Sequence, residues 1–238
     1  LSITFVTILL AGCKKDDEFL DVPPLSVIPT DLAFSDPAHV LSILGDLYYR
    51  QVDFSSLDTG WKSFADFSES FPSENGSYFL VQRTGWGYGE WAEWNYGYIR
   101  ELNLFIQRDS ASTALTEADK TRFMAEARFL RANYYFELVK RMGGVPLITS
   151  PLVYDPSKGD VTSLQIPRAK ESEVYDFIIS EAEAIKDQLP ADVNVKSRAT
   201  DAAALALKSR AALYAASIAK YGATTPQVSL PGEEVGIP

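Results

Sequence analysis

Apolar residues that recur at helical spacing between capping signals constrain the fold more than any other feature. The clearest case begins at Thr116-Glu117-Ala118-Asp119, which resembles a capping box. It ends at Gly143-Gly144, with Lys140 and Arg141 in the last turn, as helix ends prefer. The sequence therefore predicts a long helix. Its buried stripe is expected to contain Phe123, Ala127, Leu130, Tyr134 and Leu138.

Other stretches show the same period and their own end signals. Ser35-Asp36-Pro37 reads as a helix start, and Pro190 and Gly222 are expected to stop two later helices. The expected helices cover about 35–48, 90–107, 170–189 and 200–221. In the last of them, the stripe is expected to contain Ala203, Leu207, Ala211, Tyr214, Ile218 and Tyr221.

Segments without a period separate these helices. The longest covers 50–89, and a shorter irregular one runs from 145 to 167. Loops of the first length are uncommon in a compact domain unless they carry a function. The spacing Ala132-x-x-x-Phe136 resembles part of a tetratricopeptide repeat, although no strict repeat period is present. The predicted fold class is all-α, a tetratricopeptide-like helical scaffold with long irregular loops.

The first residues predict export and a lipid anchor. Leu1 to Leu10 is apolar and too short to span a bilayer, which takes about 20 residues, but it fits the core of a signal peptide. Leu10-Ala11-Gly12-Cys13 then resembles a lipobox, which implies cleavage before Cys13 and lipidation of its sulfur. The alternative is a buried strand with an inert thiol, but the charges that begin at Lys14 argue against it.

This interpretation divides the chain into three parts. We expect 1–12 to be a truncated lipoprotein signal peptide and 13–30 a lipidated tether, with prolines that keep it extended. The rest, 31–238, is expected to form the helical domain.

Composition excludes several classes of function. A net charge of −10 argues against nucleic acid and against anionic lipid headgroups, so membrane contact is expected through the lipid anchor only. One cysteine and one histidine cannot form a disulfide or a four-ligand zinc site. That histidine, His39, falls in the first turn of an expected helix and is given no catalytic role. We expect no catalytic residue, no metal and no cofactor.

Three blocks resemble the SusD/RagB family of nutrient-binding lipoproteins. They are 125–149 with EARFLRA and GGVPL, 166–190 with Pro-Arg and Leu-Pro landmarks, and 198–216 with Thr-x-x-Ala-Ala-x-Ala-Leu. The resemblance implies oligosaccharide ligands, or peptides in some members. It also implies a TonB-dependent, SusC-like transporter on which the lipoprotein sits as a lid. A palmitate-type anchor in the outer membrane, facing the cell exterior, goes with it. Family members continue beyond the third block, so 31–238 is expected to be an incomplete N-terminal domain.

Within the first block, Glu126, Arg128 and Arg131 have spacings that permit side-chain pairing. We interpret them as a buried or half-buried ion network between helices. The neighbouring Tyr134, Tyr135 and Phe136 are expected in or near the core.

Eight aromatic residues between Tyr78 and Tyr98 mark a candidate binding surface. Aromatic rings stack on the apolar face of a sugar, and nearby polar groups fix its hydroxyls. Trp86 and Tyr88 stand on a glycine-flanked loop, which favours ligand contact, whereas Trp94 and Tyr98 share a helix face that favours core packing. The interpretation of Trp91 stays open. The candidate glycan-binding residues are Trp86, Tyr88, Trp91, Tyr78, Asn75, Arg83 and Glu90.

Two other functions remain as alternatives. The aromatic loop is also what an interaction scaffold for peptides or for the transporter alone would present. A glycosidase would need two carboxylates about 5–10 Å apart in a cleft. The acids near the aromatic residues that permit it are Glu69, Glu74, Glu90 and Glu93.

Overall fold

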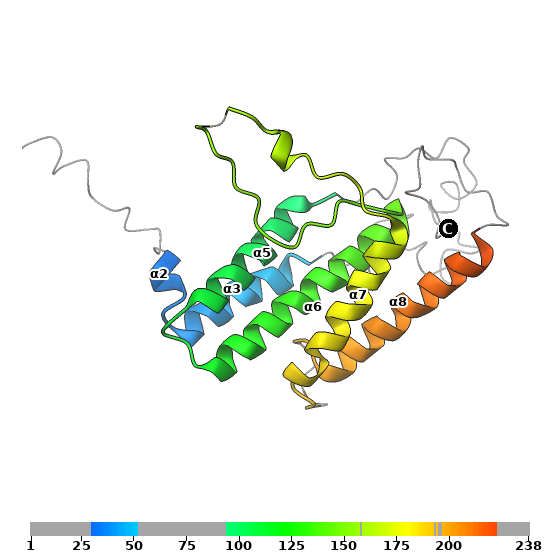
Figure 1. The fold of residues 1–238 in the computed structure, drawn as a ribbon. Coiled ribbons are helices and arrows are strands. Elements are labelled where there is room, and N and C mark those ends of the chain that lie inside the picture. The colour runs from blue at the N-terminus through cyan, green and yellow to red at the C-terminus, as the bar shows by residue number, and fades with distance from the viewer. Residues whose placement is uncertain (1–29, 52–93, 158, 193, 195–196, 223–238) are drawn as a thin grey trace, which may run out of the picture.

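The computed structural model describes residues 30–51, 94–157, 159–192, 194 and 197–222 (Figure 1). Helices dominate this part of the chain, and no strand occurs in it, which confirms the all-α prediction. The longer helices are α3 (Pro37–Tyr49), α5 (Tyr96–Ala111), α6 (Glu117–Met142), α7 (Glu171–Ile185) and α8 (Asp201–Tyr221). Shorter elements are α2 (Thr30–Ala33), η2 (Thr162–Leu164) and η3 (Lys186–Gln188).

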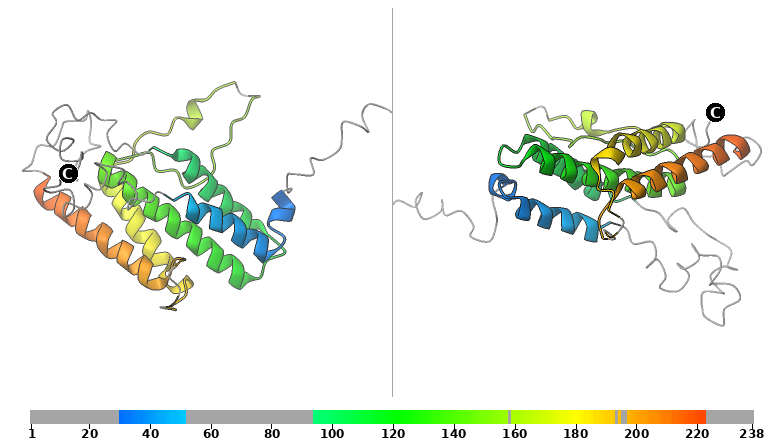
Figure 2. Two further views of the ribbon diagram at one scale, coloured as in Figure 1. Left: turned by 180° about the vertical axis from the view of Figure 1, so that it is seen from behind. Right: turned by 90° about the horizontal axis from the view of Figure 1, so that it is seen from below.

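Helix α6 is the centre of the arrangement. Helices α5 and α7 pack against it, α8 lies beside α7, and α3 covers α5 and α6 from another side (Figures 1 and 2). This position follows from its sequence, because α6 has buried side chains on several faces rather than on one stripe. Among them, Ala132, Tyr135, Phe136 and Leu138 are wholly buried.

Three of the predicted helix starts, those of α3, α6 and α8, are confirmed by their caps. The side chain of Asp36 accepts a hydrogen bond from the backbone N–H of Ala38 at 2.8 Å. Thr116 caps α6 and Thr200 caps α8 in the same way, each through its hydroxyl. Such a cap stabilises a helix by about 1 kcal/mol because it satisfies one of the first free N–H groups. At the other end of α6, Gly143 adopts a positive φ of 67°, which a glycine tolerates without strain.

The start of α5 differs from the prediction. The sequence predicted that this helix begins at Glu90, whereas it begins at Tyr96 in the structure. The reason is that Asn95 is the N-cap residue, and its side chain accepts a hydrogen bond from the N–H of Tyr98. Trp94 therefore precedes the helix and is 37% exposed, so its prediction as a core residue was wrong. Tyr98 is buried as predicted, with its hydroxyl donating to the carbonyl of Leu47.

The stripe predicted for α8 is correct only in its first half. Leu207 and Ala211 are buried, whereas Tyr214 and Tyr221 are exposed, as is Leu213 on the outer side. Within the described residues, α8 packs against α7 and the neighbouring end of α6, which covers one side only. In the second half of the stripe, the partly exposed Tyr214 contacts the buried Phe136 ring, with centroids 5.3 Å apart, and Ile218 is partly buried against the same core.

The segment between α6 and α7 is irregular, as predicted, apart from η2. It projects from the bundle and returns to it (Figure 1). Its two ends are tied together where the N–H of Ala169 donates to the carbonyl of Val145. In this part of the molecule, no helix combines the length and hydropathy that crossing a bilayer would require.

Candidate functional site

The residues predicted to touch a glycan lie outside the described residues, as does Cys13. The structure therefore leaves their roles as predictions. The same holds for the carboxylates that a glycosidase would need, Glu69, Glu74, Glu90 and Glu93. The glycan candidates concerned are Asn75, Tyr78, Arg83, Trp86, Tyr88, Glu90 and Trp91.

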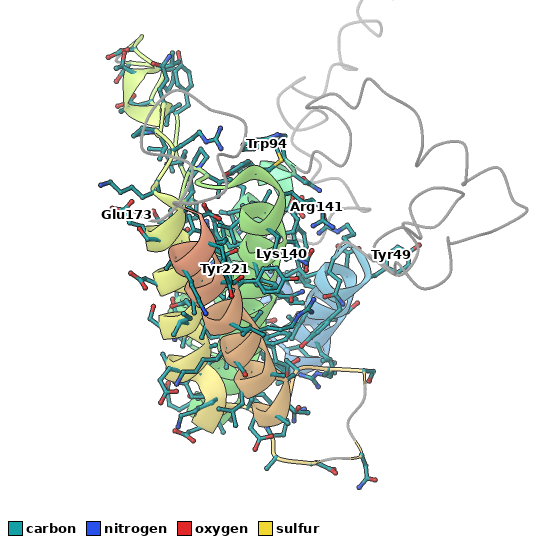
Figure 3. All side chains as sticks on the ribbon, turned by 90° about the vertical axis from the view of Figure 1, so that its right-hand side faces the viewer. Tyr49, Trp94, Lys140, Arg141, Glu173 and Tyr221 are labelled. Carbon is teal, nitrogen blue, oxygen red and sulfur yellow. The ribbon has the colours of Figure 1, made fainter. Side chains whose placement is uncertain are left out.

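The described chain nevertheless shows where this predicted loop is attached. It leaves the described part at Gln51, after α3, and re-enters it at Trp94, before α5. The labelled Tyr49 and Trp94 lie at the same end of the bundle as Lys140, Arg141 and Tyr221 (Figure 3). We call this the loop end of the bundle.

Trp94, Tyr96 and Arg168 form a group at the loop end that we call the Trp94 platform. The rings of Trp94 and Tyr96 are nearly parallel, at 21°, with centroids 6.2 Å apart. The Arg168 guanidinium lies over the Trp94 ring, 5.8 Å from its centroid. Stacking and cation–π contact each contribute on the order of 1 kcal/mol, so they hold the partly exposed indole in one orientation.

Arg168 is itself fixed by the end of α6. Its Nε donates to the carbonyl of Gly144 at 2.6 Å, and another guanidinium nitrogen donates to the carbonyl of Met142. These carbonyls belong to the last turn of the helix and its exit, where backbone oxygens lack helical partners and attract positive charge. The guanidinium is thus positioned for Trp94 by backbone groups that a lysine would not match in the same planar geometry.

The backbone on both sides of Trp94 is anchored too. The N–H of Asn95 donates to the Tyr134 hydroxyl at 2.8 Å, and the Tyr96 hydroxyl donates to the carbonyl of Pro146 at 2.9 Å. Burial raises the pKa of Tyr96, with a smaller contribution from Tyr135, so its hydroxyl stays a donor at any physiological pH. Trp94 is therefore a rigid, partly exposed ring rather than a loosely held surface side chain.

Positive charge gathers at the same end of the bundle. Lys140 and Arg141 extend from the last turn of α6, and both pair with Glu137 at 2.7 Å. Burial lowers the pKa of Lys140, and the nearby carboxylate of Glu137 opposes that shift. Glu137 thus binds two cations at the loop end of the bundle.

The predicted ion network is confirmed, in two separate parts. Glu126 is wholly buried and is held by Arg198, Arg122 and the Tyr48 hydroxyl. Arg128 and Arg131 pair instead with Glu181 of α7. Tyr134, Tyr135 and Phe136 are buried as predicted.

Sequence patterns missed Trp94 and Arg168 as site residues. Periodicity placed Trp94 on the face of Tyr98, yet a cap signal was present in Asn95, which is a preferred helix start. No local signal links Arg168 to Trp94, because they lie 74 residues apart and meet only through the fold. Chemically, the platform offers a flat apolar ring beside a fixed cation, which suits the C–H face of a sugar.

An all-α scaffold with an exposed aromatic platform at one end is the class of protein that this fold and site define. A family model described as "SusD-like", starch-binding and associating with the outer membrane, matches residues 18–213. The chain belongs to this SusD-like family.

Individual relatives agree with this assignment. A SusD-like protein of Formosa agariphila is 26% identical over an alignment of 175 residues that covers 65% of this chain and 32% of that protein. A SusD-like crystal structure from Bacteroides fragilis is 31% identical and has a TM-score of 0.56, covering 81% of this chain and 38% of that one. A SusD-like carbohydrate-binding protein from the same species is similar in fold, with a TM-score of 0.58 at 22% identity, over 80% of this chain and 39% of that one. The chain thus spans about a third to two fifths of the length of these relatives.

Proposed function

We propose that this chain captures oligosaccharides at the outer membrane and passes them to a TonB-dependent, SusC-like transporter. The observation that supports it most is the match over 18–213 to a family described as starch-binding and associated with the outer membrane. A binding role needs no catalytic group, and we propose none. Anchoring through a lipidated Cys13, with the domain facing the cell exterior, belongs to the same proposal.

The Trp94 platform supports glycan capture over a purely structural role. A rigid ring loses little conformational entropy when a sugar stacks on it, so its exposed area is available for affinity. It adjoins the segment that carries the predicted glycan contacts Trp86, Tyr88 and Trp91. We propose that these aromatic residues and the platform act on one ligand.

We expect Trp94→Ala to weaken glycan binding by about 5- to 30-fold, because it removes a stacking contact on the order of 1–2 kcal/mol. Affinity electrophoresis against a panel of soluble polysaccharides measures this as lost retardation. Trp86→Ala and Tyr88→Ala are expected to have similar effects. Tyr154→Ala, which removes an exposed tyrosine from the projecting segment, is the matched control.

Two outcomes would count against glycan capture. If no polysaccharide retards the wild type, the alternative of a peptide-binding or transporter-only scaffold takes its place. If a glycan binds but Trp94→Ala and Tyr154→Ala behave alike, the family activity stands and the platform is not the site. Circular dichroism of each variant checks that the helices have folded.

The lipid anchor has its own test. We expect labelled palmitate to enter the protein in a host that processes lipoproteins, and Cys13→Ser to abolish the label because it removes the only thiol. Cell fractionation should then move the variant out of the membrane fraction. Label that persists in Cys13→Ser would contradict lipidation at this residue.

A further inference from the structure

Asp109, near the C-terminal end of α5, is a buried carboxylate that the proposed function does not use. Its exposed fraction is 0%, and among the residues that the structure describes neither of its carboxylate oxygens has a hydrogen-bond partner. An unpaired ionised carboxylate in such a place costs several kcal/mol of desolvation. The end of α5 adds to this cost, because the helix dipole is negative there.

The residue that lies along this part of α5 is Phe34, just after α2. Phe105, Asp109 and Ser112 share one face of the helix at spacings of four and three residues. The Phe34 ring contacts the Phe105 ring, with centroids 5.6 Å apart, and the Phe34 carbonyl accepts a hydrogen bond from the Ser112 hydroxyl at 2.8 Å. Phe34 therefore contacts this side of the helix both before and after the position of Asp109.

The packing around Phe34 leaves it room to move. It lines two open hollows: one of about 260 Å³ between α3 and α5, and one of about 550 Å³ beside the end of α5 and the residues that follow it. The segment 32–36 is short. Beyond the Ser112 contact, its hydrogen bonds within the described residues are local: Ser35 donates to the carbonyl of Leu32, and Asp36 accepts from the N–H groups of Ala38 and Val40. Elements with few tertiary contacts open at low free energy, well below global unfolding.

The charged groups that act on Asp109 come chiefly from the start of α6. Lys120 favours the ionised form and Asp119 opposes it, but burial outweighs both and raises the pKa of the Asp109 carboxyl to about 7. Lys120 is also engaged by Glu117, at 2.9 Å. Arg108, on α5 itself, lines both hollows, and α3 packs on this core with apolar residues such as Val40 and Leu44.

We propose that the segment 32–36 is a proton-sensitive latch, closed over α5 when Asp109 carries a proton and loosened when Asp109 is ionised. Opening exposes the carboxylate to water, which removes the desolvation cost of its charge. The sign follows from linkage: the closed state binds the proton more tightly than the open state, so the closed latch loses stability as pH rises from about 4 to about 7, and loses no more above that. Because this segment lies between α2 and α3, the state of the latch determines how stably the first described residues pack on α5.

Hydrogen exchange followed by mass spectrometry tests the latch between pH 5 and 9, with rates corrected for intrinsic exchange. The opening constant of amides in 32–40 should rise by up to about tenfold per pH unit between about pH 4 and 7 and level off above pH 7. Asp109→Asn should remove that rise, and Asp176→Asn, which changes an exposed acid on α7, should keep it. Amides of α7 serve as the internal reference.

Several results would overturn the proposal. One is the same pH dependence in the wild type and in Asp109→Asn; another is an equal rise in α7, which would mean global loosening. If Asp109→Asn does not fold, carboxyl NMR of the wild type and of Phe34→Ala decides. The latch requires the pKa of Asp109 to fall toward its ordinary value when Phe34 no longer covers it, and an unchanged pKa would refute it.

Discussion

Replacing Glu126 with glutamine is expected to lower the free energy of unfolding by about 3 kcal/mol, the lower end of the range for breaking a buried ion pair. Glu126 is wholly buried in α6, and its carboxylate accepts hydrogen bonds from Arg198 at 2.5 and 2.8 Å and from Arg122 at 3.2 Å. Glutamine cannot neutralise either arginine. We expect a loss of stability at the lower end of this range because both arginine side chains are partly exposed, so solvent screens their charges.

Tyr48, on α3, also binds the Glu126 carboxylate and so links a third part of the chain to it. The Tyr48 hydroxyl donates to Glu126 at 2.9 Å and accepts from the N–H of Ala199 at 2.8 Å. Burial raises the pKa of Tyr48, and the charge of Glu126 raises it further, so the hydroxyl remains a donor. Glu126 thus joins α3, α6 and the approach to α8, and its loss is expected to make unfolding less cooperative.

Urea denaturation monitored by circular dichroism measures the effect. Glu117→Gln is the control, because Glu117 also lies on α6 but is 89% exposed, and its loss should cost no more than about 1 kcal/mol. A double-mutant cycle of Glu126 with Arg198 should give a coupling on the order of 1–3 kcal/mol. A loss equal to that of the control would show that the carboxylate contributes no more than a surface group.

The two ion networks illustrate how far sequence reasoning reaches. Helical spacing within α6 indicated that Glu126, Arg128 and Arg131 face other helices, and this was confirmed. The partners, Arg198 and Glu181, lie 50 or more residues away, and no local pattern names them. Spacing determines which side of a helix a residue occupies, whereas the choice of partner depends on how helices pack.

The same limit explains the errors at the ends of helices. The helical spacing of apolar residues predicted that α5 begins at Glu90. In the structure Asn95 is the N-cap residue, and the helix begins at Tyr96. Period alone cannot distinguish a ring on the core side of a helix from one just before its first turn. On α8, Tyr214 and Tyr221 fit the apolar stripe but are exposed, although the Tyr214 ring contacts the buried Phe136 ring. An apolar pattern therefore predicts which side of a helix faces the core, but not how completely each side chain is covered.

Glu181→Gln is expected to cost about 3–5 kcal/mol at pH 7, because it leaves two arginines without their carboxylate in a largely buried site. Arg128 binds Glu181 through two nitrogens, at 3.0 and 2.7 Å, and Arg131 binds it at 2.9 Å. The side chain of Arg131 is only 6% exposed, and it also donates to the Asn103 amide oxygen and to the carbonyl of Thr149. The network therefore fixes the start of the projecting segment against α5 and α6.

The dependence of this effect on pH has a definite sign. Burial alone would raise the pKa of Glu181, but hydrogen bonds and charge from Arg128 and Arg131 outweigh it and hold the pKa below the ordinary value. A depressed pKa gives stability that is present above the unfolded pKa and is lost as pH falls through the folded one. The difference between wild type and Glu181→Gln should thus be largest near neutrality and shrink below about pH 4.

Denaturation at pH 7, 5, 4 and 3 measures that difference. Asp109 acts in the opposite direction between about pH 4 and 7, because its pKa is raised rather than lowered. The same comparison is therefore repeated in the Asp109→Asn background, between Asp109→Asn alone and the double variant with Glu181→Gln. This separates the contribution of Glu181 from that of Asp109. A difference between wild type and Glu181→Gln that stays constant from pH 7 to 3 would contradict the ion pair as its source and would point to packing. A difference that shrinks with acid links the stability of the scaffold to the charge that holds the projecting segment in place.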